Sequence, residues 1–299
     1  MINKKIQLGN NENVCLTTYV VECLKQNEKK PAIVVCPGGG YLGLSLKEKE
    51  CVAIGFNQKG YHAFTLEYST LSNAKDKSVF PEPLIELAKA IKIIKENSDE
   101  WNVDTNKISI IGFSAGANLA ANYGVYWNKE LLKEVDSNAE NLKINTLILC
   151  YPLLDFELND EILKRRYNEV IDSGQVTGEN SMEKFALDMM KKSNKAFLGE
   201  EEPSIEQMHM VSPVYNISPS VPPTFVWHTF EDGLITVQQS LKYASKLKES
   251  NIPCELHIYE KGQHGLSLAD ETSATKDSDI NKNVSTWFQL AVNWLKLHE

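Results

Sequence analysis

The amino-acid sequence predicts an α/β fold with a mostly parallel central sheet and helices on both faces. Two observations lead to this fold class. Six short apolar runs, rich in β-branched residues, show no clear polar alternation, which is typical of strands buried on both faces. Amphipathic helical patterns lie between these runs, as in successive βαβ units. With 299 residues, of which 42% are hydrophobic, the chain is long enough for a sizeable core.

The expected elements follow in chain order. Before residue 31, KKIQLG and VCLTTYVVEC are expected to form two antiparallel edge strands, joined by the turn NNEN. The central strands are expected within residues 31–40, 61–69, 107–114, 144–152, 222–229 and 254–260. The helices are expected within residues 45–60, 83–101, 115–127, 236–251 and 284–298.

One region interrupts the alternation of strands and helices. Residues 155–213 contain two or three short helical segments with polar connections, and the region is too long for an ordinary link between strands. We interpret it as a cap inserted over the C-terminal edge of the sheet. We therefore expect residues 1–299 to form a single domain that carries this cap insertion.

Charge and composition exclude several classes of protein. The net charge is −9, from 31 basic and 40 acidic residues, and no dense basic cluster indicates nucleic-acid binding. No apolar run is long enough for a membrane span, and the N-terminus lacks the pattern of a cleaved signal peptide. The six cysteines are scattered without metal-ligand spacing. We expect a cytoplasmic protein that needs no metal or organic cofactor; the sequence leaves open whether it forms a homo-oligomer.

The segment Gly112-Phe113-Ser114-Ala115-Gly116 lies where a strand pattern ends and a helix pattern begins. In an open parallel sheet this is the edge at which ligands bind. A serine hydroxyl is exposed there on a very tight turn, around which little more than Gly or Ala fits two residues to either side. The amide-rich N-terminus of the following helix favours developing negative charge. Ser114 is therefore the candidate nucleophile, although the pentapeptide alone often occurs by chance.

A glycine triplet follows the first central strand, in the segment CPGGGYLGLS at residues 36–45. Glycines let the backbone approach a ligand closely, and acyl transfer needs two or three N–H donors for the tetrahedral oxyanion. The candidate donors are the amides of Gly39, Gly40 and Ala115. The alternatives are a flexible turn or a phosphate loop. Neither a Walker A motif nor a dinucleotide fingerprint is present.

Two acidic residues follow the late strand in the segment FVWHTFEDGLITV at residues 225–237. A carboxylate there could hold an imidazole in the correct tautomer and stabilise its charged form. Glu231 and Asp232 compete for this role. We favour Asp232, because it lies further beyond the end of the strand; Glu231 is then a solvated loop charge.

His264 stands between two glycines in the loop after the last strand, in the segment YEKGQHGLSLAD. It alone of the six histidines occupies a glycine-flanked loop at the expected edge of the sheet, where an imidazole could reach a serine. The other five lie within strands, in the cap or near the C-terminus, and are expected to be packed or solvated. The chain order Ser114, Asp232, His264 is that of α/β-hydrolases.

Several segments together resemble a known family. They are PGGGY, GFSAGANLAA, YPLLDF, VSPV, PPTFVWHTFED, SLKYASKL and ELHIYEKGQHGLSLA. They are similar to α/β-hydrolase carbohydrate esterases of the acetyl xylan and feruloyl esterase type, relatives of hormone-sensitive-lipase esterases and prolyl-oligopeptidase-like hydrolases. The resemblance extends from about residue 31 to residue 298 and leaves the N-terminal strands and much of the cap unmatched.

The chain departs from these relatives at two places. Many relatives have His-Gly-Gly-Gly at the glycine triplet. This chain instead has Pro37 before the glycines, as the carbohydrate esterase group does. The loop that relatives write as Asp-Asp-x-x-Val-Pro reads Glu-Asp-Gly-Leu-Ile-Thr at residues 231–236. The second acid is kept, which supports Asp232, and the lost proline affects only the start of the following helix.

The resemblance implies a serine esterase. Ser114 would attack an ester carbonyl, His264 would take its proton, and Asp232 would orient His264. The implied partner is a small-molecule ester, most simply an acetyl ester of a sugar or xylo-oligosaccharide. Tyr41, Leu42 and Trp227 are candidates for the wall of a small acyl pocket, although aromatic residues at such positions often belong to the core.

Other functions remain open on the sequence alone. Within the hydrolases they are a general carboxylesterase, a formamidase and a peptidase, although such peptidases usually carry a propeller domain for which this chain has no room. Outside the enzymes, the same fold could serve as an inactive ligand-binding receptor. The presence of serine, acid and histidine together argues against a receptor, because binding alone does not need all three.

Overall fold

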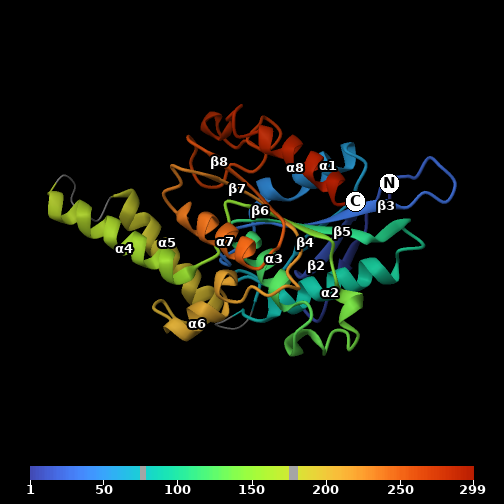
Figure 1. Ribbon diagram of the computed structural model, residues 1–299, viewed down its shortest axis with the longest axis horizontal. Helices are drawn as coiled ribbons and strands as arrows, with labels where there is room; N and C mark the ends of the chain where they lie inside the picture. The colour runs from blue at the N-terminus through green and yellow to red at the C-terminus, as the bar shows by residue number, and fades with distance from the viewer. Residues whose placement is uncertain (75–78, 175–180) are drawn as a thin grey trace.

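A single sheet lies at the centre of the computed structural model, which describes residues 1–74, 79–174 and 181–299 (Figure 1). Within these residues eight strands pair in the order β1-β2-β4-β3-β5-β6-β7-β8. They are β1 (Lys5–Gln7), β2 (Cys15–Tyr19), β3 (Lys30–Cys36), β4 (His62–Glu67), β5 (Val103–Phe113), β6 (Thr146–Cys150), β7 (Thr224–Thr229) and β8 (Cys254–Tyr259). Strands β3 to β8 pair in parallel, whereas β1 and β2 are antiparallel. The predicted mostly parallel sheet with an antiparallel edge is confirmed.

The helices alternate with the central strands as the sequence predicts. In the described residues they are α1 (Glu50–Gln58), α2 (Glu82–Glu96), α3 (Ala115–Tyr126), α4 (Phe156–Ser173), α5 (Met182–Leu198), α6 (Ile205–Met210), α7 (Gln238–Glu249) and α8 (Thr286–Leu297). Short 3-10 turns are η1 (Leu46–Glu48), η2 (Glu130–Leu132), η3 (Ala139–Leu142), η5 (Pro213–Tyr215) and η6 (Asp277–Asp279). Helix α7 forms without the proline of the relatives and without a side-chain N-cap.

Two apolar layers cover the two faces of the sheet. On one face the strands pack against α2, α3 and α7, and on the other against α1 and α8 (Figure 1). Strand β3 shows why its sequence lacks polar alternation: Val34 faces the first layer and Val35 the second, and both are fully buried. Strand β8 differs from this pattern. It lies at the edge of the sheet, and most of its residues are only partly buried.

Helices α4 and α5 of the cap insertion project from the body of the molecule, at the left of Figure 1. We expected short helices, but α4 has 18 residues and α5 has 17. Their ends explain the length. Asp155 and Ser181 accept N-terminal N–H groups, and Gly174 and Gly199 end the two helices in the left-handed conformation. The polar residues thus cap long helices rather than interrupting them.

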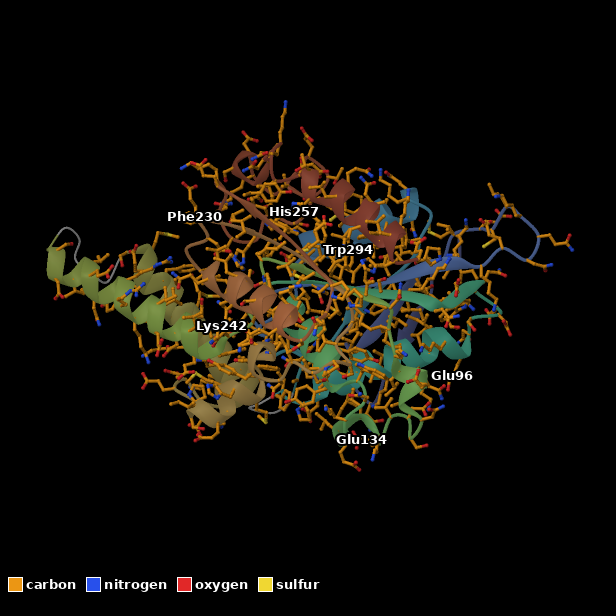
Figure 2. The ribbon with its side chains drawn as sticks, viewed as in Figure 1. Glu96, Glu134, Phe230, Lys242, His257 and Trp294 are labelled. Atoms are coloured by element: carbon orange, nitrogen blue, oxygen red, sulfur yellow. The ribbon has the colours of Figure 1, made fainter. Side chains whose placement is uncertain are left out.

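An ion pair fixes the start of the cap insertion to the body. Lys242 of α7 (Figure 2) contacts the buried carboxylate of Asp155, with Nζ 2.5 Å from Oδ2. The Tyr215 hydroxyl also lies 3.1 Å from the Lys242 ammonium. These contacts hold the N-terminus of α4 next to α7.

In the described residues, no helix combines the length and apolar composition needed to cross a membrane.

Candidate active site

Ser114 lies on the tight turn between β5 and α3 and has the uncommon backbone angles φ 53° and ψ −116°. A Cβ atom at Gly112 would lie 2.2 Å from the Gly116 carbonyl oxygen, and one at Gly116 would lie 2.1 Å from that of Cys36. Even alanine would therefore overlap backbone atoms at both positions. The expectation that Gly or Ala would fit is too permissive, because only glycine lets the chain turn here and present Ser114 at the sheet edge.

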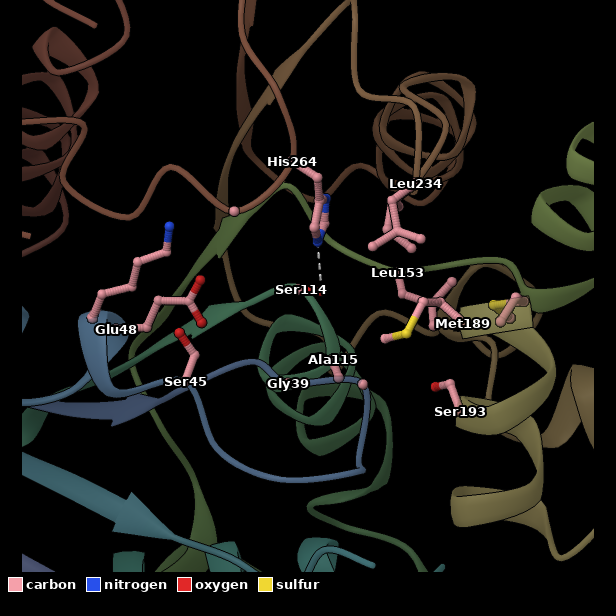
Figure 3. A pocket seen from close by; sticks show the side chains of 15 residues that line it. Gly39, Ser45, Glu48, Ser114, Ala115, Leu153, Met189, Ser193, Leu234 and His264 are labelled. Carbon is pink, nitrogen blue, oxygen red and sulfur yellow. Dashed lines mark hydrogen bonds between the residues drawn. The ribbon is translucent and has the colours of Figure 1, made fainter. Parts of the chain in front are cut away.

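The loops after β7 and β8 bring Asp232 and His264 to Ser114. His264 Nε2 lies 2.9 Å from Ser114 Oγ, and His264 Nδ1 lies 2.6 Å from Asp232 Oδ2 (Figure 3 shows the Ser114 contact). The Asp232 side chain is fully buried, and that of His264 is 15% exposed. Three residues from three loops, with Ser114 and His264 150 positions apart in the sequence, thus form one hydrogen-bonded line.

Asp232 accepts four hydrogen bonds. Its Oδ1 accepts the N–H groups of Leu234 (2.9 Å) and Ile235 (2.8 Å). Its Oδ2 accepts from His264 and also lies 3.1 Å from His228 Nε2. Glu231 points outward and pairs with a lysine on the surface. The geometry therefore brings Asp232, and not Glu231, to the imidazole.

The Asp232 and His264 side chains shift each other's pKa. Burial alone would raise the pKa of Asp232, but the two histidines beside it outweigh burial and hold it well below its usual range. Burial alone would lower the pKa of His264, but the Asp232 carboxylate outweighs burial and raises it. Asp232 is thus ionised, and the pair is arranged to stabilise an imidazolium.

The glycine loop between β3 and η1 presents backbone N–H groups beside Ser114. Gly39 and Gly40 have φ angles of 129° and 62°, and both line the same cavity as Ser114 and Ala115. In the described part of the chain, the N–H groups of Gly39, Gly40 and Ala115 have no hydrogen-bond acceptor. They are therefore available to a ligand at this site.

A cavity of about 280 Å³ opens between the glycine loop, Ser114 and helix α5 (Figure 3). Ser45 and Glu48 stand on one side of it, and Leu153, Leu234 and Met189 on the other. Most of the side chains on the α5 side are apolar. The cavity is suited to a small group with an apolar end.

The three residues proposed for the pocket wall do not line this cavity. Tyr41 is fully buried, donates a hydrogen bond to Asn118 Oδ1 (2.7 Å) and stacks on Phe197. Trp227 is also fully buried. Its ring lies in the apolar layer that packs against α1 and α8, where it stacks on Trp287. Leu42 packs against the core. The assignment of these three residues to the pocket is wrong.

Glu48, Tyr151 and His228 lie near the site, although their positions in the sequence do not predict it. Glu48 is buried and accepts the Gly38 N–H at 2.7 Å, and it also accepts the Tyr151 hydroxyl at 2.6 Å. His228 is buried, as expected, but it contacts Asp232. Its Nε2 faces only acceptors, so it carries the proton, and Nδ1 accepts from Ser240 Oγ at 2.8 Å.

None of the six cysteines lines the cavity beside Ser114. All six cysteines are free, and Cys36 and Cys150 are fully buried. Burial raises the pKa of both thiols, which keeps them protonated and unreactive. Within residues 1–74, 79–174 and 181–299, no group of three or more His, Cys, Asp or Glu side chains is placed to hold a metal ion.

Two proteins are similar to this chain in sequence. An endo-1,4-beta-xylanase B from Butyrivibrio fibrisolvens is 28% identical over 81% of this chain and 33% of the relative. An acetylxylan esterase from Xylanibacter ruminicola is 24% identical over 82% of this chain and 43% of the relative. The chain thus spans less than half the length of these two relatives.

A solved structure agrees over nearly the whole chain. The acetyl ester-xyloside bifunctional hydrolase from Caldicellulosiruptor lactoaceticus is 29% identical, covers 98% of this chain and 96% of its own, and has a TM-score of 0.75. The BD-FAE family model matches residues 20–247, which is more than half of the chain. The predicted α/β-hydrolase fold is confirmed, and the chain belongs to the BD-FAE family.

Proposed function

We propose that this chain is a serine esterase that hydrolyses short acyl esters, most simply acetyl esters, of sugars or xylo-oligosaccharides. One observation carries the proposal: Asp232, His264 and Ser114 form a hydrogen-bonded line at the wall of a small cavity. A buried acid, an imidazole and a serine in this arrangement can activate the hydroxyl as a nucleophile.

Acylation begins when Ser114 Oγ attacks the ester carbonyl carbon and His264 Nε2 takes the hydroxyl proton. The Asp232 carboxylate stabilises the imidazolium that forms. The N–H groups of Gly39, Gly40 and Ala115 donate to the tetrahedral oxyanion. His264 then protonates the leaving oxygen as the C–O bond breaks, which releases the alcohol and leaves an acyl group on Ser114.

Deacylation repeats these steps with water. His264 removes a proton from a water molecule, whose oxygen attacks the acyl carbon. The same three N–H groups stabilise the second oxyanion. Collapse of this intermediate returns the proton to Ser114 and releases the carboxylic acid, so that the enzyme is ready for another ester.

The choice of acyl group and alcohol rests on two supports. The cavity of about 280 Å³ beside Ser114 is small and has apolar side chains on its α5 side, which suits a short acyl chain. Relatives of this chain include an acetylxylan esterase and an acetyl ester-xyloside hydrolase. Together they favour an acetylated saccharide as the substrate.

The deciding experiment compares three substrates at equal concentration. We expect the wild-type protein to release acetate from acetylated xylo-oligosaccharides faster than it cleaves formylkynurenine or methyl ferulate. Preference for formylkynurenine would instead indicate a formamidase, and preference for methyl ferulate a feruloyl esterase. No turnover of any ester, including p-nitrophenyl acetate, would favour a ligand-binding receptor on the same fold.

A further inference from the structure

A second cavity, of about 510 Å³, adjoins the one that contains Ser114. His264, Leu234 and Lys47 line both cavities. The second cavity lies between the cap helices α4 and α5 and the loops after β7 and β8. The imidazole therefore stands at the junction of two spaces, only one of which contains the serine.

Helix α5 forms a wall that runs along both spaces. Met182, Phe185 and Ala186 face the second cavity, and Met189, Met190 and Ser193 face the first. These positions follow the spacing of three and four residues that marks one face of an α-helix. One continuous helix face thus borders both cavities, which together form the two arms of a single cleft.

The two arms differ in chemistry. Beside Ser114 the α5 wall consists of two methionines and Ser193, whereas the second cavity adds the charged side chains of Arg166, Glu183 and Lys276 to its apolar α5 residues. Among the residues that the structure describes, these three side chains have no hydrogen-bond or ion-pair partner. The Phe185 ring beside them is 56% exposed. This arm offers free polar groups next to an apolar ring.

We propose that the second cavity binds the alcohol half of the ester, and that this alcohol is a sugar. The inference rests on the proposed esterase function. His264 must protonate the leaving oxygen, so the alcohol has to lie on the side of the imidazole, where the second cavity opens. Sugar hydroxyls can pair with the free charged groups, whereas an alkyl chain would bury them without partners. The apolar face of a sugar ring packs on Phe185.

The test uses two esters that share the acetyl group and differ in the alcohol: an acetylated xylo-oligosaccharide and methyl acetate. We expect Phe185→Ala and Arg166→Gln each to lower kcat/KM for the oligosaccharide about tenfold, as expected for a lost contact of ordinary strength. Methyl acetate is too small to fill the second cavity, so its kcat/KM should stay within about twofold.

Arg165→Gln is the matched control, because Arg165 is adjacent on α4, is solvated and pairs with Glu169. It should leave both substrates unchanged. Equal losses on both esters, or no loss on either, would overturn the inference, as would a wild type that cleaves methyl acetate but not the oligosaccharide. If the wild type releases acetate from neither ester, the proposed function itself fails and this inference falls with it.

Discussion

The Tyr151 hydroxyl donates a hydrogen bond to Glu48 Oε1 (2.6 Å), and Glu48 Oε2 accepts the Gly38 N–H (2.7 Å). The same Tyr151 oxygen accepts the Ser267 N–H at 3.0 Å. Burial raises the pKa of the Tyr151 phenol well above its usual value, which keeps it a donor. The glycine loop is thus joined through buried groups to the loop that carries His264.

The Tyr151 hydroxyl is predicted to hold the glycine loop in position through Glu48. Tyr151→Phe removes the hydroxyl and leaves the Glu48 carboxylate and the Ser267 N–H without a partner in a buried place. We expect kcat to fall about tenfold with little change in KM, because the donors of the glycine loop are then less well fixed for the oxyanion. Steady-state kinetics with p-nitrophenyl acetate measures both constants.

The control for this substitution is Tyr123→Phe. Tyr123 is also fully buried and donates one hydrogen bond, to the Leu142 carbonyl oxygen at 2.6 Å. It should lower the melting temperature by a comparable amount and leave kcat unchanged. Equal losses of kcat in both variants would show that the effect of Tyr151→Phe comes from lower stability and not from the position of the glycine loop.

The pH dependence of the reaction tests the Asp232–His264 pair. Catalysis needs neutral His264, and the carboxylate raises the pKa of this imidazole. In the pH profile of kcat/KM, the apparent pKa of the acid limb should therefore lie above the usual histidine pKa of about 6.5. Activity should rise as the pH increases through this apparent pKa. Asp232→Asn removes the charge, so burial then dominates and the limb should move to lower pH as the rate falls. An unmoved limb would contradict this assignment.

His228 is expected to support Asp232 without touching the substrate. His228→Leu removes the N–H that points at Asp232 Oδ2, and we expect kcat/KM to fall about tenfold because a buried carboxylate loses a donor. His228→Gln, which keeps an N–H donor, should recover part of the loss. Ser240→Ala leaves the contact with Asp232 in place and serves as the control. If all three variants lose kcat/KM to the same extent, His228 does not act through its contact with Asp232.

Met189 is predicted to limit the length of the acyl chain. It lines the cavity beside Ser114, and Met189→Ala should enlarge the apolar space there. We expect the ratio of kcat/KM for butyrate to that for acetate to rise by up to about fifteenfold, since butyrate has two more methylenes than acetate and each buried methylene contributes about 0.8 kcal/mol. Met182→Ala on the same helix, at the second cavity, should leave the ratio unchanged. A rise in both variants would place the acyl chain elsewhere.

Much of the fold follows from local patterns. Runs such as 108–113 are buried on both faces, and such strands carry a clear signal in a single sequence. The sequence makes Ser114 and His264 candidates because small residues flank them at strand ends, and Asp232 because it follows a late strand. Each of these residues sits where the local pattern changes.

The pocket could not be predicted in this way. Whether Trp227 faces the site or the core depends on which side of β7 it occupies, and the sequence of a doubly buried strand does not record that side. Glu48 stands in a charged segment that resembles a solvated helix start, and its burial depends on Tyr151, about 100 residues later. Met189, Met190 and Ser193 line the cavity because they lie on α5, a helix of 17 residues, where the sequence predicts shorter helices.

We predict that Ser114 is the residue that esters acylate. Treatment with diethyl p-nitrophenyl phosphate, followed by intact and peptide mass spectrometry, measures this. We predict one diethylphosphoryl group per chain, on Ser114, together with complete loss of ester hydrolysis. Ser114→Ala should take up no label and lose at least about 10³-fold in turnover while its melting temperature stays near that of the wild type. Label on another residue, or full turnover by Ser114→Ala, would contradict the claim.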